Sequence, residues 1–444
     1  MDDVVVLGAS LAGLWAAAAA AAAGGRVVLV DRDPAPVRPS ARSGVPQGAQ
    51  PHVFLHRGLR AAEELLPGLR TDLAAVGGIS VDTGRLPWLG EHGWLPAHPS
   101  YDVVSLTRPL LEHVVRERVL ALPGVEVRWG ARVAGLTHSG DGWRVRVPDG
   151  SDLTARLVVD ATGRSSRLRT WLSEIGVSTP EPMIVDAHLG YATQLLEGGP
   201  DPRDIPGVVV QATPQSPVGG LALPVEGQRW LVTALGFGAQ RPPRDADGFA
   251  AFLAALPDPA LSEIQQLGRP VGEVAVHRQT GNRRQRYGGV QDWPEGLLAV
   301  GDALCCFDPI YGQGITVSAC QALHLRTALE SEGRAGASRR LLRELDRVVD
   351  FPWAVAIGQD LQMPSSSGRQ TPAQAAVSAW ASQVARRAVQ GDLRAHQVLM
   401  QTYHLEGSAT ALLHPALVAS VAIGRLSRTA ARGPRPAVLD VLAA

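Results

Sequence analysis

The sequence contains no lysine: all 42 basic residues among its 444 are arginine, and they balance 42 acidic residues to a net charge of zero. The absence of lysine excludes a Schiff-base mechanism, a lysine-dependent phosphate loop and any lysine-borne reactive intermediate. The balanced charge provides no field that favours nucleic acid or an acidic membrane surface as a partner.

Cysteine is also scarce, with Cys305, Cys306 and Cys320 as the three examples. Their spacing fits neither a metal site nor a disulfide framework, so we predict no bound metal and a reducing, cytoplasmic location. We interpret the adjacent pair Cys305 and Cys306 as small buried residues, because nothing nearby in the sequence indicates an activated thiolate.

One uncharged run, residues 4–24, would read similarly in a membrane span or a signal peptide. Asp2 and Asp3 precede this run where a signal peptide carries positive charge, and Ala and Gly dominate it. We therefore predict a strand over Val4–Leu7, a glycine turn and an Ala-rich helix, with no membrane span.

A possible nucleotide-binding unit follows from that division. GASLAG spans residues 8–13, and a second strand, Val27–Val30, ends at Asp31. Gly8 permits a tight turn, Gly13 allows close helix packing, and Asp31 is placed to accept a hydrogen bond from a ribose hydroxyl. Ser10 occupies the usual middle glycine position. An ordinary buried βαβ unit is the alternative, but strand, turn, helix and acid together favour dinucleotide binding.

The rest of the chain predicts an interrupted α/β domain. Short strands follow a helix at 107–121, and an antiparallel sheet is expected from about 179 to 285. An apolar run typical of a buried strand occurs at 297–303, and a long helix is expected to follow at about 314–331. The C-terminal hundred residues read as Ala-rich helices, with breaks at Pro352 and at residues 364–368.

Three signatures, GASLAG with Asp31, DATGRSSRLR (160–169) and GDALCCFDPIYGQGIT (301–316), resemble the aromatic-hydroxylase class (group A) of FAD-dependent monooxygenases. The resemblance spans most of the chain through residue 331. A narrower likeness, to the flavin-dependent epoxidases of bacterial polyether biosynthesis, lies in four motifs: SGVPQGAQPH (43–52), LGYATQLL (189–196), GNRRQRY (281–287) and DPIYGQG (308–314).

The resemblance implies an α/β fold with a Rossmann-like, glutathione-reductase-type FAD-binding domain and an inserted antiparallel substrate domain. The expected boundaries are 1–78, 101–178 and 287–335 for the FAD-binding domain, 79–100 and 179–286 for the substrate domain, and 336–444 for a helical C-terminal region.

The same resemblance implies FAD contacts at both ends of the chain. Asp302 is expected at the ribityl and pyrophosphate region, and the turn from Pro309 to Gly314 is expected along the isoalloxazine ring. A helix beginning near Gly314 would place partial positive charge at the flavin N1/O2 edge. Alternatives are a plain strand–helix joint capped by Asp302 and solvent-facing arginines. The full expected set is Gly8, Ser10, Ala12, Gly13, Asp31, Arg32, Arg42, Gln47, Arg108, Val133, Asp160, Asp302, Pro309, Gly312, Gly314 and Ile315.

The implied chemistry is oxygen transfer from a C4a-hydroperoxyflavin to an alkene in an apolar secondary metabolite, giving an epoxide. Alternatives are hydroxylation of a phenol or indole ring, a flavin-dependent C=C reductase, and a non-catalytic nucleotide-binding protein. No acid–base pair is evident, so the catalytic residues are left unassigned. Tyr191, Phe307 and Pro309 are the expected pocket residues, with core packing as the alternative for the two aromatics. His188 is expected on the same strand as Tyr191 but on the opposite face.

The electron donor is left open between NADPH and NADH. The hydroxylases carry Asp-Gly in their middle signature, where this chain has Thr162-Gly163, so electrons arrive either directly or through a partner flavin reductase. Asp360 is expected either beside the flavin ring edge or on a solvent-facing helix.

Overall fold

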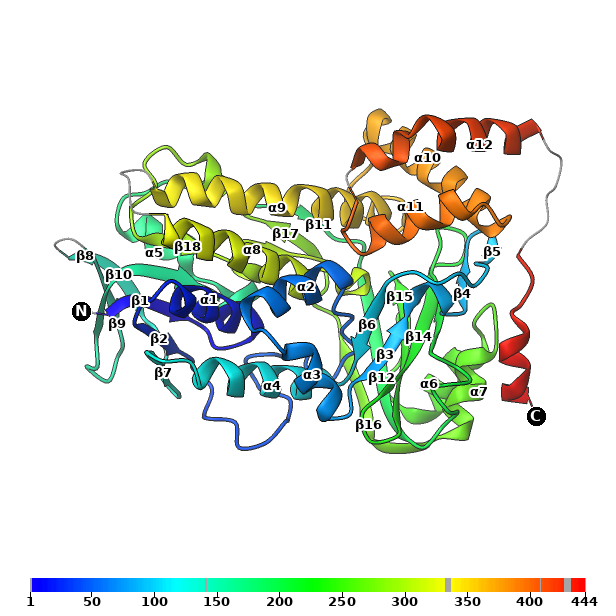
Figure 1. Cartoon of the computed structure of the whole chain (residues 1–444), viewed down its shortest axis with the longest axis horizontal. Coiled ribbons are helices and arrows are strands. Elements are labelled where there is room, and N and C mark those ends of the chain that lie inside the picture. The colour runs from blue at the N-terminus through cyan, green and yellow to red at the C-terminus, as the bar shows by residue number, and fades with distance from the viewer. Residues whose placement is uncertain (1, 140–141, 332–336, 408, 427–432, 444) are drawn as a thin grey trace.

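The computed structural model describes residues 2–139, 142–331, 337–407, 409–426 and 433–443 (Figure 1). Its first sheet has the order β7-β2-β1-β10-β9-β8, and β18 also pairs with β10. The strands are β1 (Asp2–Leu7), β2 (Val27–Val30), β7 (Val125–Arg128), β8 (Gly135–Ser139), β9 (Gly142–Arg146), β10 (Leu153–Asp160) and β18 (Leu297–Ala299).

The parallel strands of this sheet end at one edge. Leu7 pairs with both Val30 and Asp160, and Asp160 in turn pairs with Ala299. The chain segments that follow these four residues therefore leave the sheet side by side, although they lie up to three hundred positions apart. In such sheets the carboxyl-terminal edge is where ligands bind.

Helices cover this sheet because their small apolar residues allow close packing. In α1 (Leu11–Ala22), nine residues are buried, mostly alanines, so the helix packs against both its own βαβ unit and α8 (Gln313–Glu330). Next to α8 lies α9 (Ala337–Asp360), and α4 (Arg108–Leu120) packs against α1 (Figure 1). Shorter helices are α2 (His56–Leu65), α3 (Leu69–Ala75) and α5 (Leu168–Glu174).

The second large sheet has the order β16-β12-β15-β14-β13-β4-β5 and is antiparallel except where β13 meets β4. Its core includes Trp230 and Phe249, and α6 (Ala246–Ala254) and α7 (Ala260–Leu267) pack on it. The strands are β4 (Trp88–Gly90), β5 (Gly93–Trp94), β12 (Leu189–Glu197), β13 (Val208–Val210), β14 (Val218–Val225), β15 (Arg229–Phe237) and β16 (Arg269–His277).

Two small sheets and a helical layer complete the fold. The small sheets are β3 (Ile79–Asp82) with β6 (Asp102–Ser105), and β11 (Met183–Val185) with β17 (Asn282–Arg284) and β19 (Cys305–Cys306). The helical layer comprises α10 (Pro372–Val389), α11 (Leu393–Tyr403) and α12 (Pro415–Leu426), above the β4–β5 end of the second sheet (Figure 1).

Two sequence-based expectations are wrong. The break expected at Pro352 is absent: Pro352 is buried inside α9, which continues to Asp360. Packing of α9 on α8 outweighs the single backbone hydrogen bond that proline forfeits. His188 does not share a strand with Tyr191, because β12 begins at Leu189 and His188 has a left-handed φ of 56°. None of the described helices is long and apolar enough to cross a bilayer.

Candidate active site

A groove lies at the carboxyl-terminal edge of the parallel sheet. Two hollows of about 130 Å³ and about 420 Å³ form it, and they adjoin each other, because both are lined by Ser10, Arg32 and Thr162. The smaller hollow reaches the ends of β1 and β2, and the larger one reaches the turn after β18. The groove therefore joins the Gly8 turn to the Asp302 turn.

The Gly8 turn requires glycine for conformational and steric reasons. Gly8 has φ of 99°, and a Cβ there would lie 2.6 Å from the carbonyl oxygen of Ala161. Gly13 lies behind the groove, where a Cβ would come within 1.8 Å of the Gly8 carbonyl oxygen. The two glycines thus let β1, β10 and α1 converge at the groove.

Ser10 fits the middle glycine position because its side chain points into a polar network. Its hydroxyl donates to Glu112 at 2.9 Å and accepts from the Arg108 Nη2 at 2.9 Å. Ser10 is the N-cap of α1 but makes no side-chain capping bond. The first backbone N–H groups of α1 therefore remain uncapped by Ser10 at the groove, where a helix N-terminus favours an anion.

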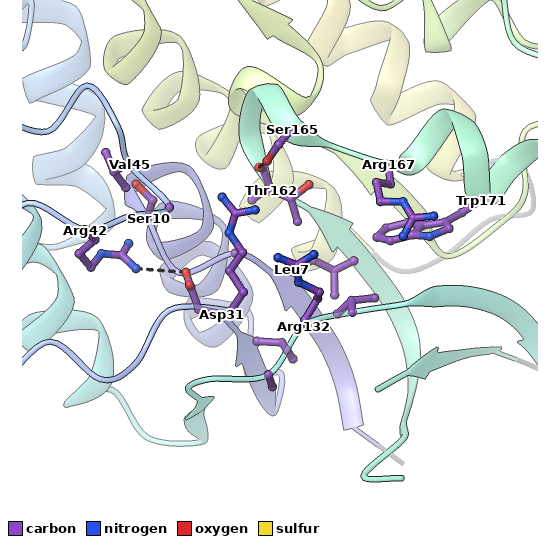
Figure 2. Close-up of a pocket in the computed structure, with 17 residues that line it drawn as sticks. Leu7, Ser10, Asp31, Arg42, Val45, Arg132, Thr162, Ser165, Arg167 and Trp171 are labelled. Atoms are coloured by element: carbon purple, nitrogen blue, oxygen red, sulfur yellow. Dashed lines mark hydrogen bonds and ion pairs between the residues drawn. The ribbon is translucent and has the colours of Figure 1, made fainter. Parts of the chain in front are cut away.

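Arg42 forms ion pairs with three carboxylates, and Figure 2 shows the one with Asp31. Its guanidinium pairs with Asp31 at 3.4 Å, Asp33 at 3.1 Å and Glu112 at 2.6 Å. Asp31 also accepts a hydrogen bond from the Ala9 N–H at 2.7 Å. Burial tends to lower the pKa of Arg42, but the Glu112 and Asp31 charges outweigh it and raise the pKa. The residue lines the groove and ties the loop after β2 to α4.

At the other end, Asp302 lines the groove from the turn after β18. Its carboxylate receives no hydrogen bond from any of the described residues. Burial raises the pKa of this carboxyl, and the charges of Arg164, Arg108 and Arg283 offset part of that rise. The turn continues through Gly312, whose φ of 65° is left-handed, into the N-terminus of α8 at Gln313.

The groove brings together most of the residues expected at a dinucleotide site. Gly13 and Asp160 are the exceptions, since neither lines it. Asp160 is fully buried and accepts hydrogen bonds from the Thr162 N–H, the Thr162 hydroxyl and the Ser166 hydroxyl, so it shapes the turn behind the groove. The lining residues are Gly8, Ser10, Ala12, Asp31, Arg32, Arg42, Gln47, Arg108, Val133, Asp302, Pro309, Gly312, Gly314 and Ile315.

A separate apolar chamber of about 340 Å³ lies beyond the Pro309 turn. His52 and Val53 line both chamber and groove, whereas Ile310 and Tyr311 line the chamber alone. Tyr191, Phe307 and Pro309 line the groove rather than the chamber. The chamber walls come from both halves of the chain and include Leu86, Trp88, Leu221, Leu235, Val355, Met363, Ala381 and Tyr403.

Sequence reasoning missed most of the chamber and several groove residues. His52 and His277 line the groove, and no motif of catalytic spacing marked them. Burial and the nearby Arg108 charge lower the pKa of His52 to about 3, and burial also lowers the pKa of His277. Asp360 is fully buried, so the solvent-facing alternative for it is wrong. Cys305 and Cys306 are buried as expected, and burial raises the pKa of both thiols.

The groove fits a dinucleotide that carries a flat ring at one end. The uncapped helix N-terminus and Arg108 suit a pyrophosphate, while the Asp302 carboxylate lacks a donor and suits a polyol hydroxyl. Glycines at 312 and 314 leave backbone accessible to a ring. No cluster of three or more metal-binding side chains occurs among the described residues. This fold and site define a flavin-dependent oxidoreductase.

The comparison with known families identifies the class more closely. Residues 1–348 match the family described as FAD binding domain, and the chain belongs to this family. It is an FAD-dependent enzyme of the monooxygenase class, whose members use molecular oxygen and an organic substrate. The predicted α/β fold with an FAD-binding domain and a helical C-terminal region is confirmed.

Three similar proteins illustrate the relationship. Protein Rv3254 of Mycobacterium tuberculosis is 31% identical over 352 residues, covering 75% of this chain and 74% of that protein. Rifampicin monooxygenase of Streptomyces venezuelae is 29% identical over 350 residues, covering 77% of this chain and 67% of that enzyme. A flavoprotein/dehydrogenase structure from Cytophaga hutchinsonii superposes with a TM-score of 0.69 at 14% identity, covering 96% and 99% of the two chains, and shows the shared fold.

Proposed function

We propose that this enzyme epoxidises an alkene in an apolar secondary metabolite. The observation that carries the proposal is the apolar chamber beside the Pro309 turn, which is large enough for a drug-sized ligand. Bound FAD would supply the activated oxygen. The chain's own residues would hold the alkene near the turn and exclude water, since a π bond is itself the nucleophile and needs no protein base.

For the cofactor, we propose one orientation along the groove. The pyrophosphate would lie at the N-terminus of α1 near Arg108, and Asp302 would accept hydrogen bonds from the ribityl chain. The segment from Pro309 to Ile315 would face the ring, and backbone at Val133 would contact adenine. Arg42 would order the loop rather than bind phosphate, because three carboxylates already occupy its guanidinium. The discontinuous domain boundaries given above stay a prediction.

Aromatic hydroxylation is the second candidate function. It is favoured by His52 and His277, two groove histidines whose lowered pKa values keep them neutral, so a ring nitrogen can accept a hydrogen bond from a phenol hydroxyl. The same lowered pKa values make both rings weak bases, so they would orient the phenol rather than remove its proton. The relative named rifampicin monooxygenase supports oxygenation in general but not one of these outcomes over the other.

The electron donor is proposed to be NADPH or NADH, either directly or through a flavin reductase. Thr162 lines the groove, but its hydroxyl already donates to the buried Asp160, and no carboxylate stands at this position of the groove wall. This arrangement supports a route through a partner reductase. Bleaching of the yellow protein by NADPH or NADH alone, at a rate near turnover, would contradict it.

The test of function uses purified, FAD-loaded protein, reduced flavin and ¹⁸O₂. Farnesyl acetate serves as the alkene probe and 2-naphthol as the phenol probe. Epoxidation predicts labelled oxygen bridging two former alkene carbons. Label found only on the naphthol ring would favour hydroxylation, and saturation of the alkene without oxygen uptake would favour a reductase. Protein that takes up no FAD would contradict all of these enzyme functions.

A further inference from the structure

A hydrogen-bonded acid cluster lies at the Pro309 turn and is not used in the function proposed above. Asp308 and Asp360 hydrogen-bond each other through their carboxyl groups. Asp308 is 1% exposed and Asp360 is fully buried. They belong to different motifs, DPIYGQG and GQDLQMP, which lie about fifty positions apart in the sequence.

The neighbours of the pair hold both carboxyls in place. Asn282 donates to Asp360 at 2.6 Å and accepts from the Asp308 backbone N–H at 2.8 Å. The Tyr311 hydroxyl donates to the other Asp360 oxygen at 2.9 Å. Asp308 also accepts from the Ile310 N–H at 3.1 Å. Each carboxyl therefore has fixed partners and a fixed direction.

The pair connects the two cavities. Asp308 lines the groove, whereas Tyr311 lines the chamber. The sequence Tyr311, Asp360, Asp308 is therefore a continuous hydrogen-bonded path through the wall between chamber and groove. His52 and Val53 also line both cavities.

The charges around the pair favour its protonated form. No arginine or histidine among the described residues forms an ion pair with either carboxylate, and the nearest charge that acts on both is that of Asp186. Burial is the main cause that raises the pKa of Asp360 to about 6 and the pKa of Asp308 well above its usual range. Two adjoining buried carboxylates cannot both ionise readily, so they retain a proton at neutral pH.

We propose that Asp308 and Asp360 share a proton and deliver it into the groove as the general acid of the oxygen reaction. Monooxygenation converts O₂, a substrate, a reduced nicotinamide and one proton into oxygenated product, oxidised nicotinamide and water. In the proposed step the carboxyl O–H bond breaks and an O–H bond forms on the oxygen atom that leaves as water, or as hydrogen peroxide when substrate is absent. The carboxylate left behind regains its proton from solvent. This role rests on the proposed FAD-dependent oxygenation but not on epoxidation.

The first experiment tests the shared proton without turnover. Infrared spectra of FAD-loaded protein at pH 7 should show a carboxylic-acid C=O band that shifts in D₂O. The band should lose intensity in the Asp308→Asn/Asp360→Asn double variant by more than it does in Asp346→Asn, an acid on α9 that does not line the groove. Absence of the band from wild-type protein, or an unchanged intensity in the double variant, would overturn the proposal.

The second experiment separates proton transfer from loop positioning. Photoreduced FAD protein is mixed with oxygenated buffer without substrate, and flavin reoxidation is followed across pH. Asp308→Asn should slow reoxidation about 100-fold and abolish its pH dependence, in line with loss of a general acid, while FAD remains bound. Asp346→Asn should keep the wild-type profile. If Asp308→Asn only weakens FAD retention and leaves rate and pH profile intact at saturating FAD, the pair merely positions the loop and the proposal fails. If wild-type protein binds no FAD, the proposed function fails, and the same infrared comparison made on the FAD-free proteins still decides whether the proton is shared.

Discussion

Replacement of Gly13 by alanine tests how closely α1 must approach the strand end. An added Cβ would lie 1.8 Å from the Gly8 carbonyl oxygen and 2.9 Å from the Gly8 carbonyl carbon. Real Cβ contacts essentially never fall below 3.0 Å, so backbone has to move by about 1.2 Å. Both atoms belong to rigid main chain, so no side-chain rotation relieves the contact.

The energy balance follows from two opposing effects. Alanine is favoured over glycine in a helix by about 1 kcal/mol, whereas overpacking against fixed backbone costs about 1–3 kcal/mol or more. Because the contact is far below the normal limit, the upper end of that cost applies, and we expect a net destabilisation of about 2 kcal/mol or more. Because α1 moves at its N-terminus, the variant should also retain less FAD.

A matched control isolates the contact. Gly358 is also helical, has no left-handed φ, and an added Cβ there meets nothing within 4 Å. Gly358→Ala should therefore stabilise the protein by about 0.5–1 kcal/mol. Urea unfolding and the FAD content after gel filtration are measured for both variants. A Gly13→Ala protein that is as stable as Gly358→Ala and holds a full complement of FAD would refute the reasoning.

Three further outcomes are expected. Asp302→Ala should lower FAD retention, because the groove loses its carboxylate acceptor; unchanged occupancy by absorbance would contradict that role. Ala381→Trp should fill the chamber from α10 and raise the KM for farnesyl acetate more than it lowers kcat, whereas Ala379→Trp, on the exposed side of the same helix, should not. Burial beside His56 lowers the pKa of His404 to about 3. The folded protein therefore resists protonation of His404, whereas the unfolded chain takes up this proton below pH 6.5, so the contribution of His404 to stability is lost as pH falls. Between pH 7 and pH 5 wild type should lose about 2 kcal/mol that His404→Gln does not lose, as measured by urea unfolding at each pH.

The sequence was sufficient for elements whose signals are local. The strand Val27–Val30, the helix near 107–121 and the long helix after Gly312 were expected close to their observed bounds, because periodicity and glycine turns lie within each segment. The helix break expected at Pro352 is absent because the packing of α9 on α8 overrides the tendency of proline to end a helix. The strand expected to include His188 begins one residue later, because a strand-like sequence pattern does not reveal a residue with a left-handed φ.

Much of the site was beyond sequence reasoning because it depends on distant contacts. The Arg42 side chain looked available for phosphate, yet Glu112, seventy positions later, meets it in the fold. Asp308 and Asp360 carry no mutual spacing signal, and only the packing of α9 behind the Pro309 turn brings them together. The chamber likewise depends on β4, β14 and α10, whose sequences show ordinary apolar residues.

The positions of the chamber residues in the sequence indicate which part of the chain sets the shape of the chamber. The family match ends at residue 348, yet Val355, Met363, Ala381 and Tyr403 close the chamber from beyond that point. The residues that line the groove thus all precede position 348, whereas the chamber is lined by residues from both sides of that position. A graft that begins after Asp360 would exchange Met363, Ala381 and Tyr403, and with them one side of the chamber, while keeping every residue that lines the groove and the Asp308–Asp360 pair.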